Sequence, residues 1–416
     1  MSVDATQPGP AGASIRRGRA LFALALGAFA IGVTEFVIAG VLPEVARSFA
    51  VTIPTAGLMV SVYAIGVVIG APLVTVVLLR FPRKEVLLGL LVLFIAGNVT
   101  TAIAPDFAIV LVGRVVAALC HGAFLGIGSI VAADLARPDR RARAIATMFT
   151  GLTVANVAGV PLGTLLGEHE GWRATFVAIA ALGGCAMVAL AVFIPPLAGS
   201  PPGGRREELA AFRRPQLWLA LAITALGFGA VYAPFTYVAP LAIRVAHFSS
   251  GTVPLLLVLF GLGLVIGNPV GARAADRSLL ATIAGLLVLL VACLVVLDQV
   301  ARNKGALAGC LFALGLIGFA TVPAFTSRVI GSAGGLRTSV LASSAAVAAF
   351  NLGNASGAFF GGRMIAAGHG DASPALIGAA MAGAALALTV VSAYLQRRTG
   401  HLDGGPGPTA DESSGR

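Results

Sequence analysis

The sequence has little charge for its length. Only 11% of its 416 residues are charged, whereas 58% are hydrophobic, and soluble domains carry roughly 25% charged residues. A water-soluble fold of this composition would lack the polar side chains needed to cover its surface. The sequence therefore predicts an integral membrane protein. We expect the lipid bilayer to be one of its partners.

Signatures of enzymes and metal sites are also missing. The chain has no Walker-type GxxxxGK[ST], GxSxG or HExxH sequence, and no pair of aspartates inside an apolar run. The four cysteines lie in apolar segments without a CxxC pair, which favours packing roles over a metal site. They are Cys120, Cys185, Cys293 and Cys310. We therefore expect no enzyme, no metal and no cofactor, with a proton gradient as the energy source for uphill transport.

The net charge of +11 does not indicate nucleic-acid binding. The basic residues stand in short clusters between apolar runs, with no basic stripe interleaved with aromatic residues. No loop is long enough to form the soluble domain that a membrane sensor usually carries. A transporter is therefore the favoured class, and a membrane enzyme or a sensor is the alternative.

Twelve apolar runs are long enough to cross a bilayer as helices, at about 20 residues for each crossing. They cover residues 20–42, 53–79, 86–104, 107–133, 144–167, 174–195, 217–242, 252–272, 279–297, 305–327, 338–367 and 374–395. The polar segment 196–216 is the longest connector and predicts a cytoplasmic linker. We expect an all-α membrane protein with six-helix bundles at 20–195 and 217–395 and with tails at 1–19 and 396–416.

The distribution of Lys and Arg predicts the orientation. If the N-terminal tail is cytoplasmic, almost all basic residues fall on cytoplasmic segments, and the outer loops receive few. Those few are Arg47, Arg173, Arg244, Arg302 and Lys304. Basic residues also occur in the same inner loop of both halves, in "RFPRKEVLL" from Arg80 and "GARAADRSLL" from Gly271. This echo predicts two repeats that rock against each other around a site near the midplane, with both termini cytoplasmic.

Three ionisable residues inside the runs are candidates for proton coupling. A charge at membrane depth is costly unless it is paired or faces water. Glu35 and Arg114 have opposite charge and are each about seven residues from the outer end of their run, which is roughly 10 Å deep. His121 lies two turns beyond Arg114 on the same helix face. We predict that Glu35 carries the proton; the alternatives are a fixed ion pair with Arg114, an interfacial position for Glu35, and a packing role for His121.

Aromatic and mildly polar residues of the second half predict a substrate cavity. The candidates are Phe228, Tyr232, Phe235, Phe319, Thr321 and Asn351. A cavity of this kind suits a small amphipathic organic molecule. The alternatives are that the rings form the core of the bundle and that Asn351 forms hydrogen bonds between helices.

Several motifs carry a resemblance to a known family. A loop signature of the family follows the second run and is matched by Arg80, Arg83 and Lys84, although Thr75, Leu79 and Pro82 replace its Gly, Asp and Gly. The same signature is echoed after the eighth run by Gly271, Asp276 and Arg277. The signature of the fourth helix is matched by Arg114, Gly122 and Gly126, and that of the fifth helix by Gly151, Gly159, Pro161 and Gly163. "GWRATF" from Gly171 and "FNLGNASGAFFGG" from Phe350 add to them. With these motifs, the chain resembles the drug:proton antiporter branch of the major facilitator superfamily, close to chloramphenicol-resistance and arabinose-efflux-like exporters.

The resemblance implies a function. It implies a bacterial inner-membrane protein with the twelve-helix major facilitator fold that exports a small molecule in exchange for protons by alternating access. A drug such as chloramphenicol is the expected substrate, with antibiotic or multidrug resistance as the result, and a sugar or nucleoside is the alternative. The loop and glycine motifs would control the change of conformation. We expect a monomer.

Overall fold

The fourth and tenth membrane helices of the chain begin in the same way, with a polar side chain that caps the helix. In the computed structural model, Asp106 accepts a hydrogen bond from the backbone N–H of Ile109, and Asn303 accepts one from Ala306. These caps satisfy backbone donors that a helix start leaves free. They place the starts of α5 (Phe107–Leu135) and α14 (Lys304–Ala333), which occupy corresponding positions in the two halves of the chain.

The structure describes residues 10–78, 81–137, 140–197, 211–334 and 339–398, and within these residues it contains helices and no strand. The first group comprises α1 (Pro10–Phe36), α2 (Ile38–Ser48), α3 (Ile53–Leu78), α4 (Arg83–Ile103), α5, α6 (Arg141–Val154), a π-helical turn (Ala155–Gly159), α7 (Val160–Glu170) and α8 (Trp172–Phe193). The second comprises α10 (Pro215–Thr236), α11 (Val238–Pro240), a π-helical turn (Leu241–Val245), a 3₁₀ turn (Ser250–Thr252), α12 (Val253–Arg277), α13 (Leu279–Val300), α14, α15 (Ser339–Ala366) and α16 (Pro374–Arg398). The predicted all-α class is confirmed.

Eleven helices of the described residues are long and apolar enough to cross a membrane. The expected crossing at 338–367 corresponds to α15, which is not among the eleven. Its sequence carries the polar residues Asn351 and Asn354, and both are buried in protein. A helix that packs against protein rather than lipid tolerates such polar residues.

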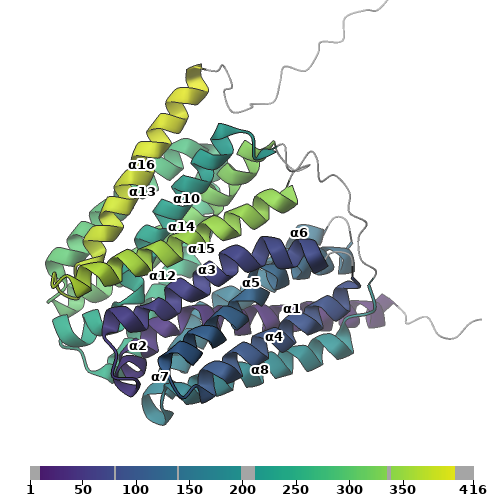
Figure 1. Cartoon of the computed structure of the whole chain (residues 1–416). Helices are drawn as coiled ribbons and strands as arrows, with labels where there is room; N and C mark the ends of the chain where they lie inside the picture. The colour runs from purple at the N-terminus through teal and green to yellow at the C-terminus, as the bar shows by residue number, and fades with distance from the viewer. Residues whose placement is uncertain (1–9, 79–80, 138–139, 198–210, 335–338, 399–416) are drawn as a thin grey trace, which may run out of the picture.

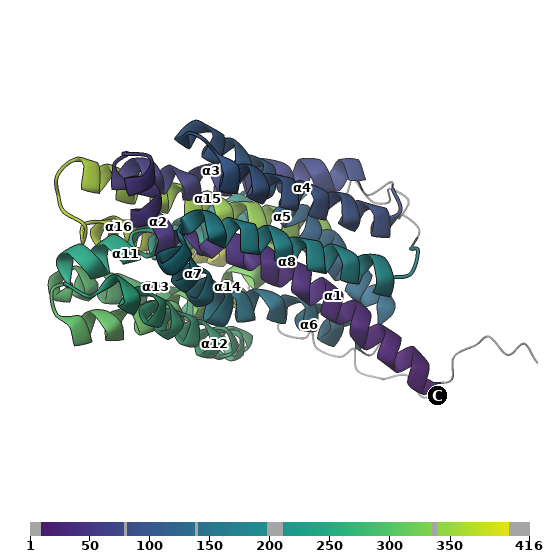
Figure 2. The same ribbon diagram turned by 90° about the horizontal axis from the view of Figure 1, so that it is seen from below.

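The two groups of helices lie side by side (Figures 1 and 2). Within the first, α5 packs against α3 and α4, and α8 packs against α1 and α4. Within the second, α14 packs against α12 and α13, and α10 packs against α15 and α16. The main contacts between the groups are α3 against α15, and α7 with its preceding π turn against α12. The site described below lies at this boundary.

The first membrane helix is longer than its sequence predicts. We expected it to end at residue 42, whereas α2 continues after a turn at Val37 and ends at Ser48. Pro43 lies inside α2 and does not end the helix, although a proline in a helix interior removes one backbone hydrogen bond. Glu35 therefore lies farther from the end of the helical segment than its apolar run indicated.

Candidate functional site

The carboxylate of Glu35 lies between the two groups of helices. One of its oxygens is 3.9 Å from Nε2 of His121 on α5, and the other accepts a hydrogen bond of 3.3 Å from the side-chain amide of Asn354 on α15. Only 11% of the Glu35 side chain and 5% of the His121 side chain are exposed. A titratable pair from the first group is thus in direct contact with the second.

His121 is held in place by Tyr63 of α3. The Tyr63 hydroxyl lies 3.1 Å from Nδ1 of His121, within hydrogen-bond distance, and the two rings meet edge to face. This bond occupies one ring nitrogen, so the other faces Glu35. A hydrogen bond at one ring nitrogen determines which of the two nitrogens remains available for proton exchange.

Arg114 is buried but does not touch the Glu35 carboxylate. Its guanidinium donates hydrogen bonds to the backbone oxygen of Thr34 at 2.8 Å and to that of Met59 at 3.4 Å. The guanidinium carbon also lies 4.1 Å from the centre of the Tyr63 ring, a cation–π distance. Arg114 therefore ties α1, α3 and α5 together around Glu35, and the alternative of a direct Glu35–Arg114 ion pair does not describe this structure.

The lengthened first helix explains why Glu35 meets His121. Glu35 is 13 residues from the end of α2 at Ser48, and His121 is 14 residues from the start of α5 at Phe107. At ~1.5 Å per residue both lie about 20 Å from that end of the bundle. Glu35 and His121 therefore lie at the same level, and the guanidinium of Arg114 reaches that level through its bond to the backbone oxygen of Thr34.

Four polar residues of this site were not among the sequence candidates. Tyr63 contacts His121, and Asn354 contacts Glu35. The Thr34 hydroxyl donates a hydrogen bond to the side-chain oxygen of Asn98 at 2.7 Å and accepts one from Arg114. Tyr63, Thr34 and Asn98 are polar residues within long apolar runs, which is a signal in the sequence. The partners of each come from distant segments, which the sequence does not indicate.

Four predicted substrate residues form one cluster of rings. Phe228 lies 5.7 Å from Tyr232 and 5.5 Å from Phe319, measured between ring centres, and Tyr232 lies 5.7 Å from Phe235. Phe36, the neighbour of Glu35, joins the cluster at 5.8 Å from Tyr232. The ring cluster therefore adjoins the polar site around Glu35.

The other two predicted substrate residues use their donors within their own helices. Thr321 donates its hydroxyl to the backbone oxygen of Gly318, and the Asn351 amide donates to that of Val347. Three buried oxygens of this region have no partner among the described residues. They are the Tyr232 hydroxyl, Oδ1 of Asn351 and Oδ1 of Asn354. Unpaired buried oxygens of this kind are available to a bound ligand.

A hollow of about 420 Å³ also lies at the boundary between the groups. It is lined by Val68 of α3, by Trp218 and Leu221 of α10, and by Ser344 and Leu352 of α15, among others. None of the predicted substrate residues lines it. The ring cluster, by contrast, is closely packed in this structure, with all four predicted aromatic side chains buried.

The predicted loop motif after α3 makes local contacts. Arg83 forms an ion pair with Asp134 at the end of α5, and Lys84 donates to the backbone oxygen of Ala191 near the end of α8. Arg80 lies outside the described residues. In the second group, Asp276 and Arg277 are exposed at the end of α12 and form no ion pair among the described residues. The two halves of the motif thus differ in their contacts.

The predicted glycines of the fifth membrane helix face the first. A Cβ at Gly151 would overlap the backbone oxygen of Ala25, and one at Gly159 or Gly163 would press against Val33 or Val37. The close approach requires glycine here. Pro161 follows the π turn Ala155–Gly159, where the altered pairing accommodates its missing N–H.

Gly271 serves a second close approach, between α12 and α14. A Cβ at Gly271 would overlap the backbone oxygen of Ala320, and Gly267, one turn earlier, faces Leu316 in the same way. The two helices therefore pack with their backbones in contact. Gly271 was predicted from the loop motif, and the structure places it in helix packing instead.

The fold and the site define a multi-pass membrane protein with a buried titratable cluster where two groups of helices meet. Residues 24–345 match the family model of the Major Facilitator Superfamily. The chain belongs to this family of transporters.

Known proteins agree with this assignment. The chain is similar to the inner membrane transport protein YdhP of Escherichia coli O157:H7, at 44% identity over 91% of this chain and 97% of that protein. It is 38% identical to a chloramphenicol resistance protein of Streptomyces lividans, over 81% of this chain and 86% of that protein. The fold is also that of a bacterial homologue of the human lysosomal transporter Spinster in an inward-facing, unoccupied conformation, with a TM-score of 0.65 and 18% identity over 94% of this chain and 98% of that one.

Proposed function

We propose that this protein exports a small amphipathic molecule across a bacterial inner membrane in exchange for protons, with Glu35 as the proton carrier. The observation that carries the proposal is the position of the Glu35 carboxylate, which contacts His121 of the first group and Asn354 of the second. A group at this boundary experiences a different environment when the two groups move relative to each other. Its proton can therefore be coupled to the change of conformation.

The surroundings of Glu35 support proton exchange rather than a permanent ion pair. Arg114, the nearest permanent cation of the site, uses its donors on backbone oxygens and the Thr34 hydroxyl. A carboxylate in a buried site without a bonded cation is costly to keep charged. Glu35 and His121 together offer two positions for one proton.

The substrate class is proposed from the ring cluster. Tyr232 and the three phenylalanines around it offer flat apolar faces, and the unpaired Tyr232 hydroxyl offers one polar contact. Such a surface favours an aromatic, mildly polar molecule over a sugar, which needs many hydrogen bonds. The similarity to a chloramphenicol resistance protein supports chloramphenicol as the first probe. The membrane and the export direction are proposed from the relatives and from the distribution of basic residues.

The proposal is tested by replacing Glu35 with Gln, which keeps the shape and the bond to Asn354 but cannot release a proton. In inverted membrane vesicles of a pump-deficient host, we expect chloramphenicol to cause proton movement with the wild type and none with Glu35→Gln, measured with a pH-sensitive dye. Glu44→Gln is the matched control, because Glu44 lies farther along the same membrane helix and pairs locally with Arg47. It should behave like the wild type.

Two outcomes would contradict separate parts of the proposal. Full chloramphenicol resistance in cells with Glu35→Gln would refute the proton role of Glu35. A wild type that shifts no drug in a growth-inhibition panel, but protects cells against a toxic sugar or nucleoside, would refute the substrate class and leave the proton mechanism standing.

A further inference from the structure

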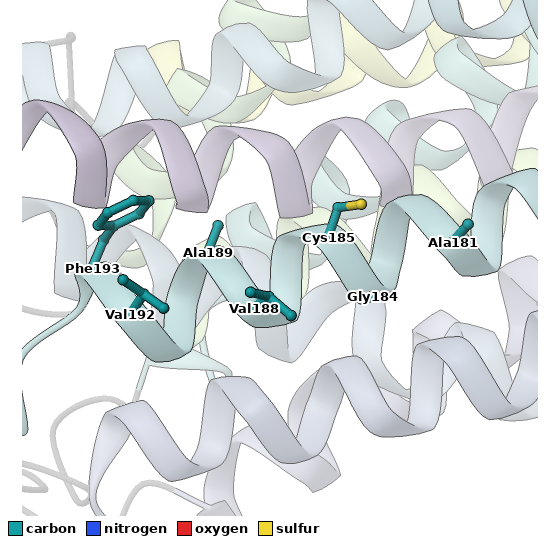
Figure 3. A pocket seen from close by; sticks show the side chains of 7 residues that line it. All are labelled: Ala181, Gly184, Cys185, Val188, Ala189, Val192 and Phe193. Atoms are coloured by element: carbon teal, nitrogen blue, oxygen red, sulfur yellow. The ribbon is translucent and has the colours of Figure 1, made fainter.

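An apolar groove runs along the outer face of α8, away from the site described above (Figure 3). It has a volume of about 530 Å³ and is lined by Ala181, Gly184, Cys185, Val188, Ala189, Val192 and Phe193. These residues recur every three or four positions, so they form one stripe of the helix. In Figure 3 the Cys185 and Phe193 side chains point toward the neighbouring ribbon, that of α1 by its colour.

Small residues create the groove. Nothing lies within 4 Å of the position that a Cβ at Gly184 would occupy, so the space beside it is open. Two of its neighbours in the stripe, Ala181 and Ala189, carry only a methyl group, whereas Val188 and Val192 stand 61% and 68% exposed beside them. The result is an open apolar groove beside the two valines.

The length of the groove matches one leaflet of a membrane. From Ala181 to Phe193 it extends over 12 residue steps, which is roughly 18 Å at ~1.5 Å per residue. The hydrocarbon core of a bilayer is about 30 Å thick, so one leaflet is about half of that. The groove therefore has the extent of a single acyl chain that lies parallel to α8.

Two cations lie at one end of the groove. The Arg19 guanidinium is 5.7 Å from the centre of the Phe193 ring, which is the last residue of the lining. The Lys84 ammonium donates one of its three N–H bonds to the backbone oxygen of Ala191, the residue before Val192. A phosphate placed at this end would meet two positive charges, and an acyl chain below it would enter the groove.

We propose that this groove binds one anionic phospholipid, with an acyl chain along α8 from Phe193 to Ala181 and its phosphate between Arg19 and Lys84. The charges select an anionic headgroup, because each Lys or Arg near a membrane surface attracts anionic lipid. The apolar stripe holds the chain. Because α1 borders the groove and carries Glu35, the lipid lies against the helix that positions the proton carrier.

The experiment is native mass spectrometry of the purified full chain, released from detergent after incubation with phosphatidylglycerol or with phosphatidylcholine of the same acyl chains. We expect the wild type to retain one phosphatidylglycerol molecule in preference to phosphatidylcholine. Gly184→Leu, which fills the open space, should lose that molecule. Arg19→Gln should retain it about fivefold less strongly, as expected for one cation near the headgroup.

Matched controls separate the groove from general effects. Gly285→Leu adds the same side chain at an exposed glycine of α13, which also has nothing within 4 Å. Arg273→Gln removes an exposed arginine near the end of α12. Both should retain lipid like the wild type, and size-exclusion profiles establish that all variants are folded.

Three results would overturn the proposal. The first is equal retention of phosphatidylglycerol by Gly184→Leu and Gly285→Leu. The second is equal retention of both lipids by the wild type. The third is an unchanged preference in Arg19→Gln, which also provides the test if Gly184→Leu fails to fold.

Discussion

The centre of the first group of helices is polar, and the centre of the second is aromatic. Around Glu35, the first group buries a guanidinium, an imidazole and a phenol that contact one another. At the corresponding level the second group presents the rings around Phe228. The two regions meet where Glu35 contacts Asn354 and where Phe36 contacts Tyr232.

This difference indicates a division of work between two halves of similar architecture. Buried polar groups need partners, and the first group supplies them from its own backbone, as with the bonds of Arg114 to Thr34 and Met59. The second group needs fewer partners because rings pack without them. We infer that the polar centre handles the proton and that the aromatic centre contacts the substrate, and three substitutions sharpen or break this comparison.

The largest effect is expected from Arg114→Leu. The change leaves the backbone oxygens of Thr34 and Met59 without their donors, and each unpaired buried acceptor costs about 1–3 kcal/mol. We expect lower thermal stability in detergent and loss of most proton-coupled efflux. Arg244→Leu is the control, because Arg244 is 57% exposed and its ion pair with Asp371 is long, at 3.8 Å. Equal stability and activity in both variants would break the comparison on the polar side.

An intermediate effect is expected from Phe228→Leu. The change keeps an apolar side chain of similar size but removes ring contacts worth about 1 kcal/mol, so the KM for chloramphenicol should rise about fivefold. The number of protons moved for each substrate molecule should stay the same. Phe359→Leu, at an exposed ring of α15, should change neither. A loss of proton coupling in Phe228→Leu would show that the two centres do not work separately.

The sequence predicted the helices well because apolar length is a local property. Eleven of the twelve expected runs correspond to helices that are long and apolar enough to cross a membrane, and the fold class is confirmed. Residues near helix ends were harder, because α2 continues through Pro43 to Ser48 where the sequence indicated an end at 42. Glu35 therefore lies farther from that end of the helix than its apolar run indicated, and it lies beside His121.

The contacts of the site were beyond the sequence for a physical reason. Asn351 and Asn354 lie one turn apart on α15, and each is a polar residue in an apolar run. The pattern of apolar residues therefore does not distinguish the role of one asparagine from that of the other. Only the packing of α15 against the first group decides that Asn354 meets Glu35, 319 positions away, while Asn351 bonds within its own helix. The glycines of the fifth helix were recognised by their motif, but their partners on α1 were not.

The smallest effect is expected from His121→Gln, which asks whether His121 exchanges protons or only packs. Gln can keep a hydrogen bond to Tyr63 but cannot take up a proton, so the variant separates the two roles. If His121 shares the proton with Glu35, chloramphenicol-driven proton movement should fall about threefold, a loss of ~0.7 kcal/mol, with KM unchanged. His169→Gln, at the end of α7, is the control and should match the wild type. An unchanged rate in His121→Gln across pH 6 to 8 would leave Glu35 as the proton carrier without help from the imidazole, and the polar centre would then act through one titratable group.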